Sequence, residues 1–211
     1  MSLADLRREY TIAGLRKKDL SPDPFAQFLK WFSEALAAPI KDANAMVLAT
    51  ADRNGAPSAR TVLLKNFNEQ GFVFFTNYNS RKGRELAENP KASLVFFWPD
   101  LERQVCIRGV ASKTTREEAE IYFHSRPLGS QLGAWASAQS ESIASRDDLE
   151  KQLLAVTARF KDQTIPMPEN WGGFRLAPHA IEFWQGRPDR LHDRFVYLFA
   201  GDQWKLERLS P

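Results

Sequence analysis

The densest group of chemically useful side chains lies in the segment GRPDRLHDRF, residues 186–195, directly after the apolar run IEFWQ. If this segment is extended, Arg190, His192 and Arg194 share one face, because side chains alternate along a strand. That face would be cationic, with a histidine that titrates near neutral pH at its centre. A solvated strand end without function explains the same residues, so other parts of the chain must distinguish the two interpretations.

An anion site is indicated at the start of NSRKGREL, where Ser80, Arg81 and Lys82 open a predicted helix after an apolar strand. Unpaired backbone N–H groups at a helix start favour an anion. Two cations at that end oppose the helix dipole unless an anion is bound, and phosphate is the natural candidate. A solvated first turn is the alternative. No Walker motif and no GxGxxG motif are present, so common nucleotide-binding folds are not indicated.

A second possible phosphate site combines Tyr122, Arg126 and Ser130. The first two lie four residues apart on a predicted helix and share a face. A hydroxyl group and a guanidinium group can together hold a phosphate, although tyrosine–arginine pairs at this spacing also stack on helix surfaces. The strand ARTVLLK adds a basic residue at each end, Arg60 and Lys65, which are either solvated or directed at a ligand.

The elements that must position these residues are mainly β-strands. Apolar, β-branched and aromatic runs predict strands over residues 45–51, 59–67, 72–77, 92–98, 102–112, 179–185, 192–200 and 203–209. The first three are predicted to form a meander, because turn-forming residues separate them. Capping residues and apolar periodicity predict helices within residues 21–39, 79–90, 114–126 and 145–160.

Two of these helices carry apolar stripes that we expect to face the core. The stripes are Phe25, Phe28, Leu29, Phe32 and Leu36 in the first helix, and Leu149, Leu153, Val156 and Phe160 in the last. Antiparallel strands with helices between them predict a mainly β, α+β fold: a Greek-key-like barrel with peripheral helices. Residues 1–20 are predicted to be an N-terminal arm, mobile or ordered against a partner or ligand, and residues 21–211 a single domain.

The composition is that of an ordinary soluble globular protein, with 43% hydrophobic and 26% charged residues among 211. A net charge of +3 is too small to indicate nucleic-acid binding by itself. No apolar run is long enough for a membrane span, and no signal peptide is apparent. The single Cys106 is expected to be a buried, inert thiol, and the three histidines show no metal-ligand spacing. We therefore expect a cytoplasmic protein without a metal.

Several of these segments together resemble the pyridoxamine 5′-phosphate oxidase (also called pyridoxine 5′-phosphate oxidase) family. In chain order they are RTVLLK, FFTNYNSRKGREL, ERQVCIRG, YFHSRP, GAWASAQS, IEFWQGRPDRLHDRF and LERLSP. The likeness extends from LRREY near the start to the last residues. Its most specific parts are RLHDR with the upstream WQG, and the SRP-x₃-Q helix end.

The resemblance implies a homodimeric split β-barrel that binds FMN at the subunit interface. The FMN contacts that it implies are Arg60, Thr61, Val62, Leu63, Leu64, Lys65, Phe75, Thr76, Arg81, Lys82, Gln104, Gln139, Ser140, Trp184 and Arg194. Phe75 stands where some relatives have tyrosine, a change that costs little if the contact is made by backbone groups.

The same resemblance assigns a substrate site. The substrate's phosphate would be held by Lys65, Tyr122, Arg126 and Ser130. Arg190 and His192 would lie against the pyridine ring as the catalytic pair, orienting the substrate and handling the proton of its C4′ substituent. Arg7 and Tyr10 match the part of the arm that closes over the substrate in relatives.

The implied reaction is oxidation of pyridoxine or pyridoxamine 5′-phosphate to pyridoxal 5′-phosphate. A hydride passes from C4′ to the flavin N5, and dioxygen takes up the electrons as hydrogen peroxide; the amine also loses ammonia. Three alternatives stay open. They are another split-barrel flavin oxidoreductase with a different substrate, a barrel that binds single-stranded nucleic acid, and a pyridoxal phosphate carrier without turnover.

Overall fold

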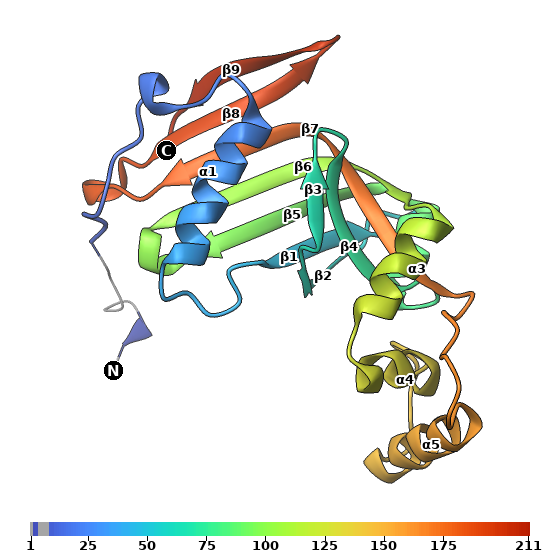
Figure 1. The fold of residues 1–211 in the computed structure, drawn as a ribbon. Helices are drawn as coiled ribbons and strands as arrows, with labels where there is room; N and C mark the ends of the chain where they lie inside the picture. Colours follow the sequence, from blue (N-terminus) through green and yellow to red (C-terminus); the bar gives the residue numbers. More distant parts are fainter. Residues whose placement is uncertain (1, 4–8) are drawn as a thin grey trace.

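The computed structural model describes residues 2–3 and 9–211. Within these residues, nine antiparallel strands form one curled, branched sheet with helix α1 across it (Figure 1). The strands are β1 Ala45–Ala51, β2 Pro57–Leu63, β3 Asn66–Asn68, β4 Gly71–Asn77, β5 Lys91–Trp98, β6 Arg103–Lys113, β7 Trp171–Gln185, β8 Asp193–Ala200 and β9 Gln203–Leu209. The helices are α1 Pro24–Ala37, α2 Arg81–Glu88, α3 Arg116–Ser125, α4 Leu128–Ala136 and α5 Arg146–Arg159. The predicted mainly β fold with peripheral helices is confirmed.

Strand β7 joins two parts of the sheet. Its first half pairs with β4, its second half pairs with β8, and β6 runs along its other side. The β6–β7 register shifts between Arg108 and Gly109, which marks a β-bulge. A Cβ atom on Gly109 would lie 2.2 Å from the carbonyl oxygen of Ala177, so the two backbones approach more closely there than a side chain allows.

The predicted meander over residues 45–77 is confirmed for its first two strands, which pair antiparallel as β1 and β2, and is wrong for the third. The sheet order is β2-β1-β5-β6-β7-β4-β3, so β1 lies between β2 and β5, and the described sheet does not pair β2 with β4. The predicted strand 59–67 is divided at Leu64 and Lys65. The Leu64 N–H donates to Asn44 and the Lys65 N–H donates to Val73, so the chain changes partner between these two residues.

Helix α1 packs its aromatic residues on the sheet. Its N-cap Asp23 accepts hydrogen bonds from two backbone N–H groups of the first turn. Phe28 contacts Phe72 with ring centroids 4.9 Å apart. The predicted stripe is confirmed for Phe25 and Phe28 as buried and for Phe32 as partly buried.

The rest of that stripe is wrong. Leu29 and Leu36 are 53% and 60% exposed, whereas Trp31 and Ala35 are buried. The helix is rotated so that its aromatic residues, which bury more area than leucine, face the sheet.

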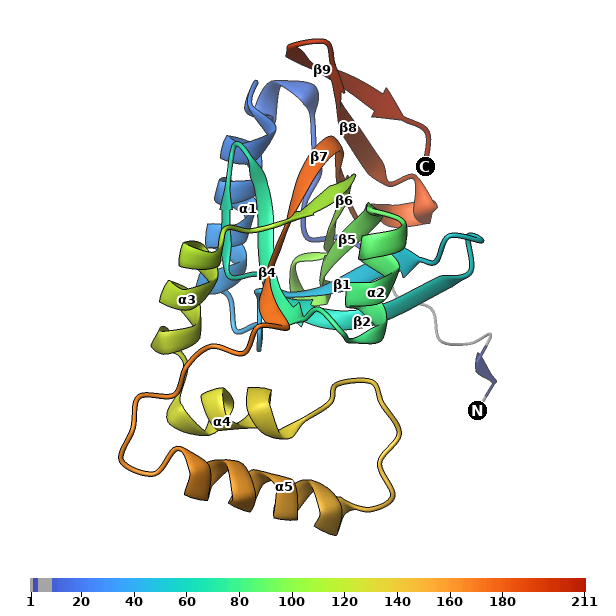
Figure 2. The same ribbon diagram turned by 90° about the vertical axis from the view of Figure 1, so that its right-hand side faces the viewer.

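The chain between β6 and β7 holds a helical excursion away from the sheet (Figure 2). Helix α4 is not among the predicted elements. Helix α5 begins at the predicted cap Ser145, but no residue of α5 is buried within the described part of the chain, and Leu153 is 39% exposed. Of its predicted stripe only Phe160, just after the helix, is buried. Leu149 and Val156 are half-buried, so the predicted stripe is only partly buried, because α5 packs mainly against α4 and not on the sheet.

The described part of the N-terminal arm is tied to the loops around β6 and β8. The Ile12 N–H donates to Glu102 Oε2 at 3.0 Å, and the Leu15 N–H donates to Asp193 Oδ2 at 3.0 Å. The division into an arm and one domain stays a prediction. In residues 2–3 and 9–211 no helix has the length and apolarity needed to cross a bilayer, and no cluster of acidic, histidine or cysteine residues has the makeup of a metal site.

Candidate functional site

A cavity of about 480 Å³ lies between the sheet and helices α2, α3 and α4; we call it the α2–α3 cavity. Its lining residues are Arg60, Thr61, Val62, Leu63, Lys65, Phe75, Thr76, Asn77, Lys82, Tyr122, Arg126, Ser130, Gly133, Ala134, Ser137, Gln139 and Trp171. All four residues predicted to hold the substrate phosphate are in this wall, together with most of those predicted to contact the cofactor.

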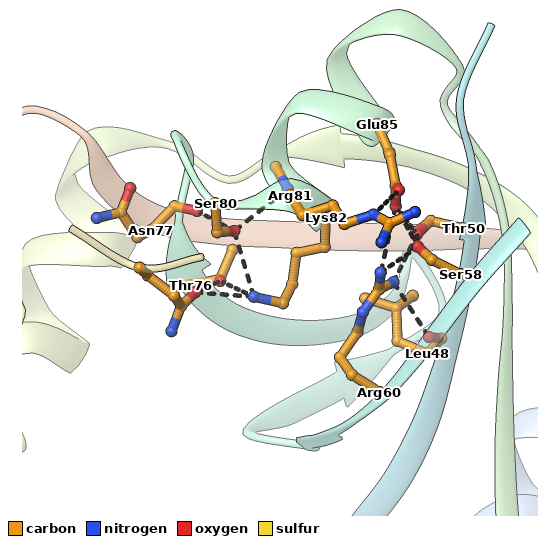
Figure 3. A network of polar contacts seen from close by, with 12 residues as sticks. Leu48, Thr50, Ser58, Arg60, Thr76, Asn77, Ser80, Arg81, Lys82 and Glu85 are labelled. Atoms are coloured by element: carbon orange, nitrogen blue, oxygen red, sulfur yellow. Dashed lines mark hydrogen bonds and ion pairs between the residues drawn. The ribbon is translucent and has the colours of Figure 1, made fainter. Parts of the chain in front are cut away.

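One end of the cavity is the start of helix α2. The N-cap residue Ser80 accepts a hydrogen bond from the Gly83 N–H. The buried Lys82 donates to Thr76 Oγ1 at 3.1 Å, Ser80 Oγ at 3.2 Å and Gln139 Oε1 at 2.8 Å (Figure 3). Burial and the nearby Arg60 lower the pKa of Lys82 to about 8. A bound anion would stabilise the charged form of this lysine.

Beside Lys82, a buried carboxylate collects several hydrogen bonds (Figure 3). Glu85 accepts from Thr50 and Ser58, from Arg60 Nη2 at 3.2 Å, and from Arg81 Nε at 2.9 Å. Burial alone would raise the pKa of Glu85, but these hydrogen bonds outweigh it and lower the pKa to about 2. Arg81 is turned toward this carboxylate and does not line the cavity, unlike the other two cations.

The other end of the cavity is aromatic and cationic. The ring of Tyr122 stacks on Phe75 at 4.1 Å, and Phe75 stacks on Trp171 at 5.5 Å. The guanidinium of Arg126 lies 4.8 Å from the Trp171 ring centroid. Trp171 is not among the predicted site residues, and it lies in none of the predicted strands or helices.

The Arg126 guanidinium has unused hydrogen-bonding capacity. Its Nη1 is buried and has no hydrogen-bond partner within the part of the chain that the structure describes. Burial lowers the pKa of this arginine. A buried N–H without an acceptor costs free energy, so a ligand oxygen beside Nη1 fits the site. Lys65 lies close by, with its Nζ 5.8 Å from the Tyr122 ring centroid.

A second group of predicted residues lies at the opposite end of β7; we call Tyr10, Gln104, Trp184, His192 and Arg194 the β8 cluster. Trp184 is directly opposite Gln104 on β6 and Arg194 on β8. Its ring centroid lies 4.6 Å from that of His192 and 5.6 Å from that of Tyr10. Arg194 Nε donates to Glu182 Oε1 at 2.7 Å, which raises the pKa of the guanidinium.

The predicted extended face of Arg190, His192 and Arg194 is wrong. Residues 188–190 form a 3₁₀ turn, and β8 begins only at Asp193. Arg190 and the residue before it have φ values of 60° and 56°, which a strand cannot contain. His192 Nδ1 accepts a hydrogen bond from the Arg187 N–H at 3.1 Å, and burial, then Arg190, lower the pKa of His192.

The remaining predicted residues lie elsewhere. The side chain of Leu64 is buried in the core, so its backbone alone is available to a ligand. Ser140 is exposed, with a φ of 75°, and borders a different hollow. Arg7 lies outside the described residues.

One chain does not bring the two groups together. Trp171 in the α2–α3 cavity and Trp184 in the β8 cluster belong to the same strand, thirteen residues apart. At about 3.3 Å per residue, that separation is on the order of 40 Å along the strand. No residue of the β8 cluster lines the α2–α3 cavity, and these two tryptophans of one chain are too far apart for one small ligand to contact both.

Comparison with known proteins gives two consecutive family matches. Residues 32–160 match the model described as Pyridoxamine 5′-phosphate oxidase, and residues 171–211 match Pyridoxine 5′-phosphate oxidase C-terminal dimerisation region. The first range contains the α2–α3 cavity except Trp171, and the second contains the β8 cluster except Tyr10 and Gln104.

Individual relatives match over almost the full length. The chain is 56% identical to the pyridoxine/pyridoxamine 5′-phosphate oxidase of Nostoc sp., covering 100% of this chain and 99% of that protein. It is also 56% identical to the protein of that name from Rubrobacter xylanophilus, covering 99% and 96%. Among solved structures, PhzG from Burkholderia lata in complex with tetrahydrophenazine-1-carboxylic acid is 31% identical, with a TM-score of 0.89 over 95% of this chain and 99% of that chain.

Proposed function

Since the chain belongs to the pyridoxamine 5′-phosphate oxidase family, we propose that it oxidises pyridoxine or pyridoxamine 5′-phosphate to pyridoxal 5′-phosphate. FMN would be the cofactor, dioxygen the electron acceptor and hydrogen peroxide a product. The observation that carries this proposal is the pair of cationic sites in one cavity, Lys82 with Arg60 at one end and Arg126 with Lys65 at the other. They suit a cofactor phosphate and a substrate phosphate.

The residues of the α2 end fit the FMN phosphate. Lys82 and Arg60 supply positive charge, and Ser80 caps a helix whose start favours an anion. The chemistry that FMN supplies when bound is acceptance of a hydride from C4′ and delivery of the two electrons to dioxygen. The protein's part is to hold the pyridine ring beside the flavin in a reactive orientation.

We propose that a homodimer completes the site. No residue of the β8 cluster lines the α2–α3 cavity of its own chain, so a cluster from a second chain would face that cavity. The sheet surface between them is apolar and exposed: Val47 and Leu63 are 40% exposed, and Phe97 is 55% exposed. The match of residues 171–211 to a dimerisation region supports this arrangement.

Arg190 and His192 are proposed to act on the substrate ring. The lowered pKa of His192 keeps the imidazole neutral at pH 7. Because Nδ1 accepts the Arg187 N–H, the proton of the neutral ring is on Nε2, which can donate to the C4′ oxygen or nitrogen. Tyr10 of the N-terminal arm lies against the same imidazole and would form one wall of the substrate site.

We also propose that the protein works in the cytoplasm. Burial and the nearby Glu182 raise the pKa of the Cys106 thiol to about 11. A neutral, half-buried thiol suits a reducing compartment.

The deciding experiment is the visible spectrum of the purified protein, before and after anaerobic addition of pyridoxine 5′-phosphate. We expect a yellow protein that bleaches and regains its colour in air. A protein that remains colourless after FMN loading and desalting would contradict the cofactor.

A yellow protein that does not bleach would favour a different substrate. The likeness to PhzG supports this second candidate, because the Arg126 site could equally hold a carboxylate. Anaerobic addition of a reduced phenazine carboxylate to the same sample separates the two, since only the true substrate bleaches the flavin.

A further inference from the structure

Glu85 accepts several of the hydrogen bonds in the polar network at the start of α2 (Figure 3). It lies one helical turn after Arg81 and is only 6% exposed. Its Oε2 accepts from Thr50, Ser58 and Arg60, while Oε1 accepts from Arg81. These donors come from β1, β2 and α2, so one carboxylate connects three elements.

This network fixes Arg60 in one orientation. Its Nη1 donates to the Leu48 carbonyl at 3.3 Å and to Thr50, and its Nη2 donates to Ser58 and to Glu85. Both terminal nitrogens are therefore held by acceptors of the protein. The guanidinium remains in the cavity wall as a fixed positive charge, which loses little freedom when an anion binds.

Arg81 is held differently. Glu85 accepts only its Nε, and its terminal nitrogens donate no further hydrogen bond to the described residues. The side chain is 64% exposed. Glu85 thus anchors the inner part of this guanidinium while its outer nitrogens stay available to an anion.

Glu85 also sets the charge of the helix start. Arg60, Arg81 and protonated Lys82 carry three positive charges, and Glu85 removes one, which leaves +2. A phosphate monoester carries close to −2 above its second pKa of about 6. The cluster therefore matches a phosphate monoester in charge, and the terminal nitrogens of Arg81 supply donors for it.

Resting on the proposed function, we infer that Glu85 is a positioning residue that makes this site selective for a flavin bearing a phosphate monoester. It acts through Arg60 and Arg81 and does not itself touch the flavin. A purely structural role, in which Glu85 only connects α2 to the sheet, predicts equal losses for phosphorylated and unphosphorylated flavin.

The test measures dissociation constants of FMN and riboflavin for flavin-free protein by fluorescence quenching. For Glu85→Gln we expect FMN binding to weaken about tenfold, the loss of one hydrogen bond to a charged group, while riboflavin binding changes less than twofold. Glu85→Asp keeps the charge and should recover part of the FMN preference. It also serves as the test variant if Glu85→Gln does not fold. Glu88→Gln makes the same change at an exposed position of the same helix and should alter neither constant.

Equal weakening of both flavins, or unchanged FMN binding in Glu85→Gln, would overturn the inference. A measurement with inorganic phosphate distinguishes failure of the inference about Glu85 from failure of the proposed function. One possible result is that the unmodified chain binds no flavin but its melting temperature rises with phosphate. If this rise is lost in Glu85→Gln and kept in Glu88→Gln, the proposed function fails and the role of Glu85 in anion binding stands. If neither flavin nor phosphate binds, both fail.

Discussion

At the scale of single residues, we expect Lys82 to make FMN binding dependent on pH. Its pKa of about 8 in the free site rises when a phosphate lies beside it, so binding requires the charged form. Affinity is therefore close to full at pH 7 and falls as the pH rises through 8, by about tenfold between pH 7 and pH 9. Titration of the FMN dissociation constant over this range measures the effect.

The control for that titration is riboflavin, which has no phosphate to interact with Lys82. Its dissociation constant should stay level from pH 7 to pH 9. Equal slopes for the two flavins would show that the titrating group is elsewhere.

Arg126 tests the other end of the cavity. We expect Arg126→Gln to raise the KM for pyridoxine 5′-phosphate by about 10- to 100-fold, because it removes a charged donor whose Nη1 has no acceptor among the described residues. The kcat at saturating substrate and the amount of bound FMN should change little. Steady-state kinetics and the flavin absorbance measure these three quantities.

Turnover of unphosphorylated pyridoxine is the matched control, since it does not engage the phosphate site. If Arg126→Gln slows both substrates to the same extent, Arg126 does not bind the phosphate.

At the scale of secondary-structure elements, the β6–β7 bulge is a point of close backbone contact. In Gly109→Ala the added methyl group would meet backbone atoms of Ala177 and Pro178 at 2.2–3.0 Å. We expect a loss of about 1–3 kcal/mol in the free energy of unfolding, measured by denaturant titration of flavin-free protein.

Gly129→Ala is the comparison for this variant, because a methyl group there meets nothing within 4 Å. It lies in helix α4 and should be neutral or slightly stabilising. Similar losses in the two variants would refute the close-contact explanation.

The elements predictable from sequence are those with a local signal. The four predicted helices are all observed, and their N-caps are Asp23, Ser80, Thr115 and Ser145, since a cap depends on residues within one turn. The order of the strands and the partners of α5 depend on distant segments, which periodicity along one segment does not reveal. The turn at 188–190 breaks the extended face considered for Arg190, His192 and Arg194, because local backbone geometry there overrides alternation of side chains.

In the candidate site, too, features with a local signal are predictable from sequence and contacts between distant segments are not. The charge at the start of α2 and the four-residue spacing of Tyr122 and Arg126 are visible in the sequence. The roles of Trp171 and Glu85 are not visible there. Trp171 is distant from Tyr122 along the chain, and the sequence around Glu85 is that of an ordinary solvated helix glutamate. Only packing shows what each contacts.

At the scale of the whole molecule, the apolar surface around Phe97 should control assembly and cofactor retention together. We expect Phe97→Glu to be monomeric and to lose FMN on gel filtration, because a charge cannot be buried between two copies without a partner. Light scattering and flavin absorbance in one chromatogram record both properties.

Leu29→Glu makes a comparable change on α1, where the side chain is similarly exposed. It should remain dimeric and yellow. A monomeric Phe97→Glu variant that kept its flavin would show that a single chain suffices for the cofactor.

The environment of Cys106 bears on how long each molecule stays active. The thiol lies on the strand that carries Gln104, directly opposite Glu182, close to where peroxide would be formed. With a pKa of about 11, only about one thiol in ten thousand is ionised at pH 7, and peroxide attacks the ionised form. The same burial and negative charge that make this cysteine useless as a nucleophile would therefore protect the enzyme from damage by its own by-product over many catalytic cycles.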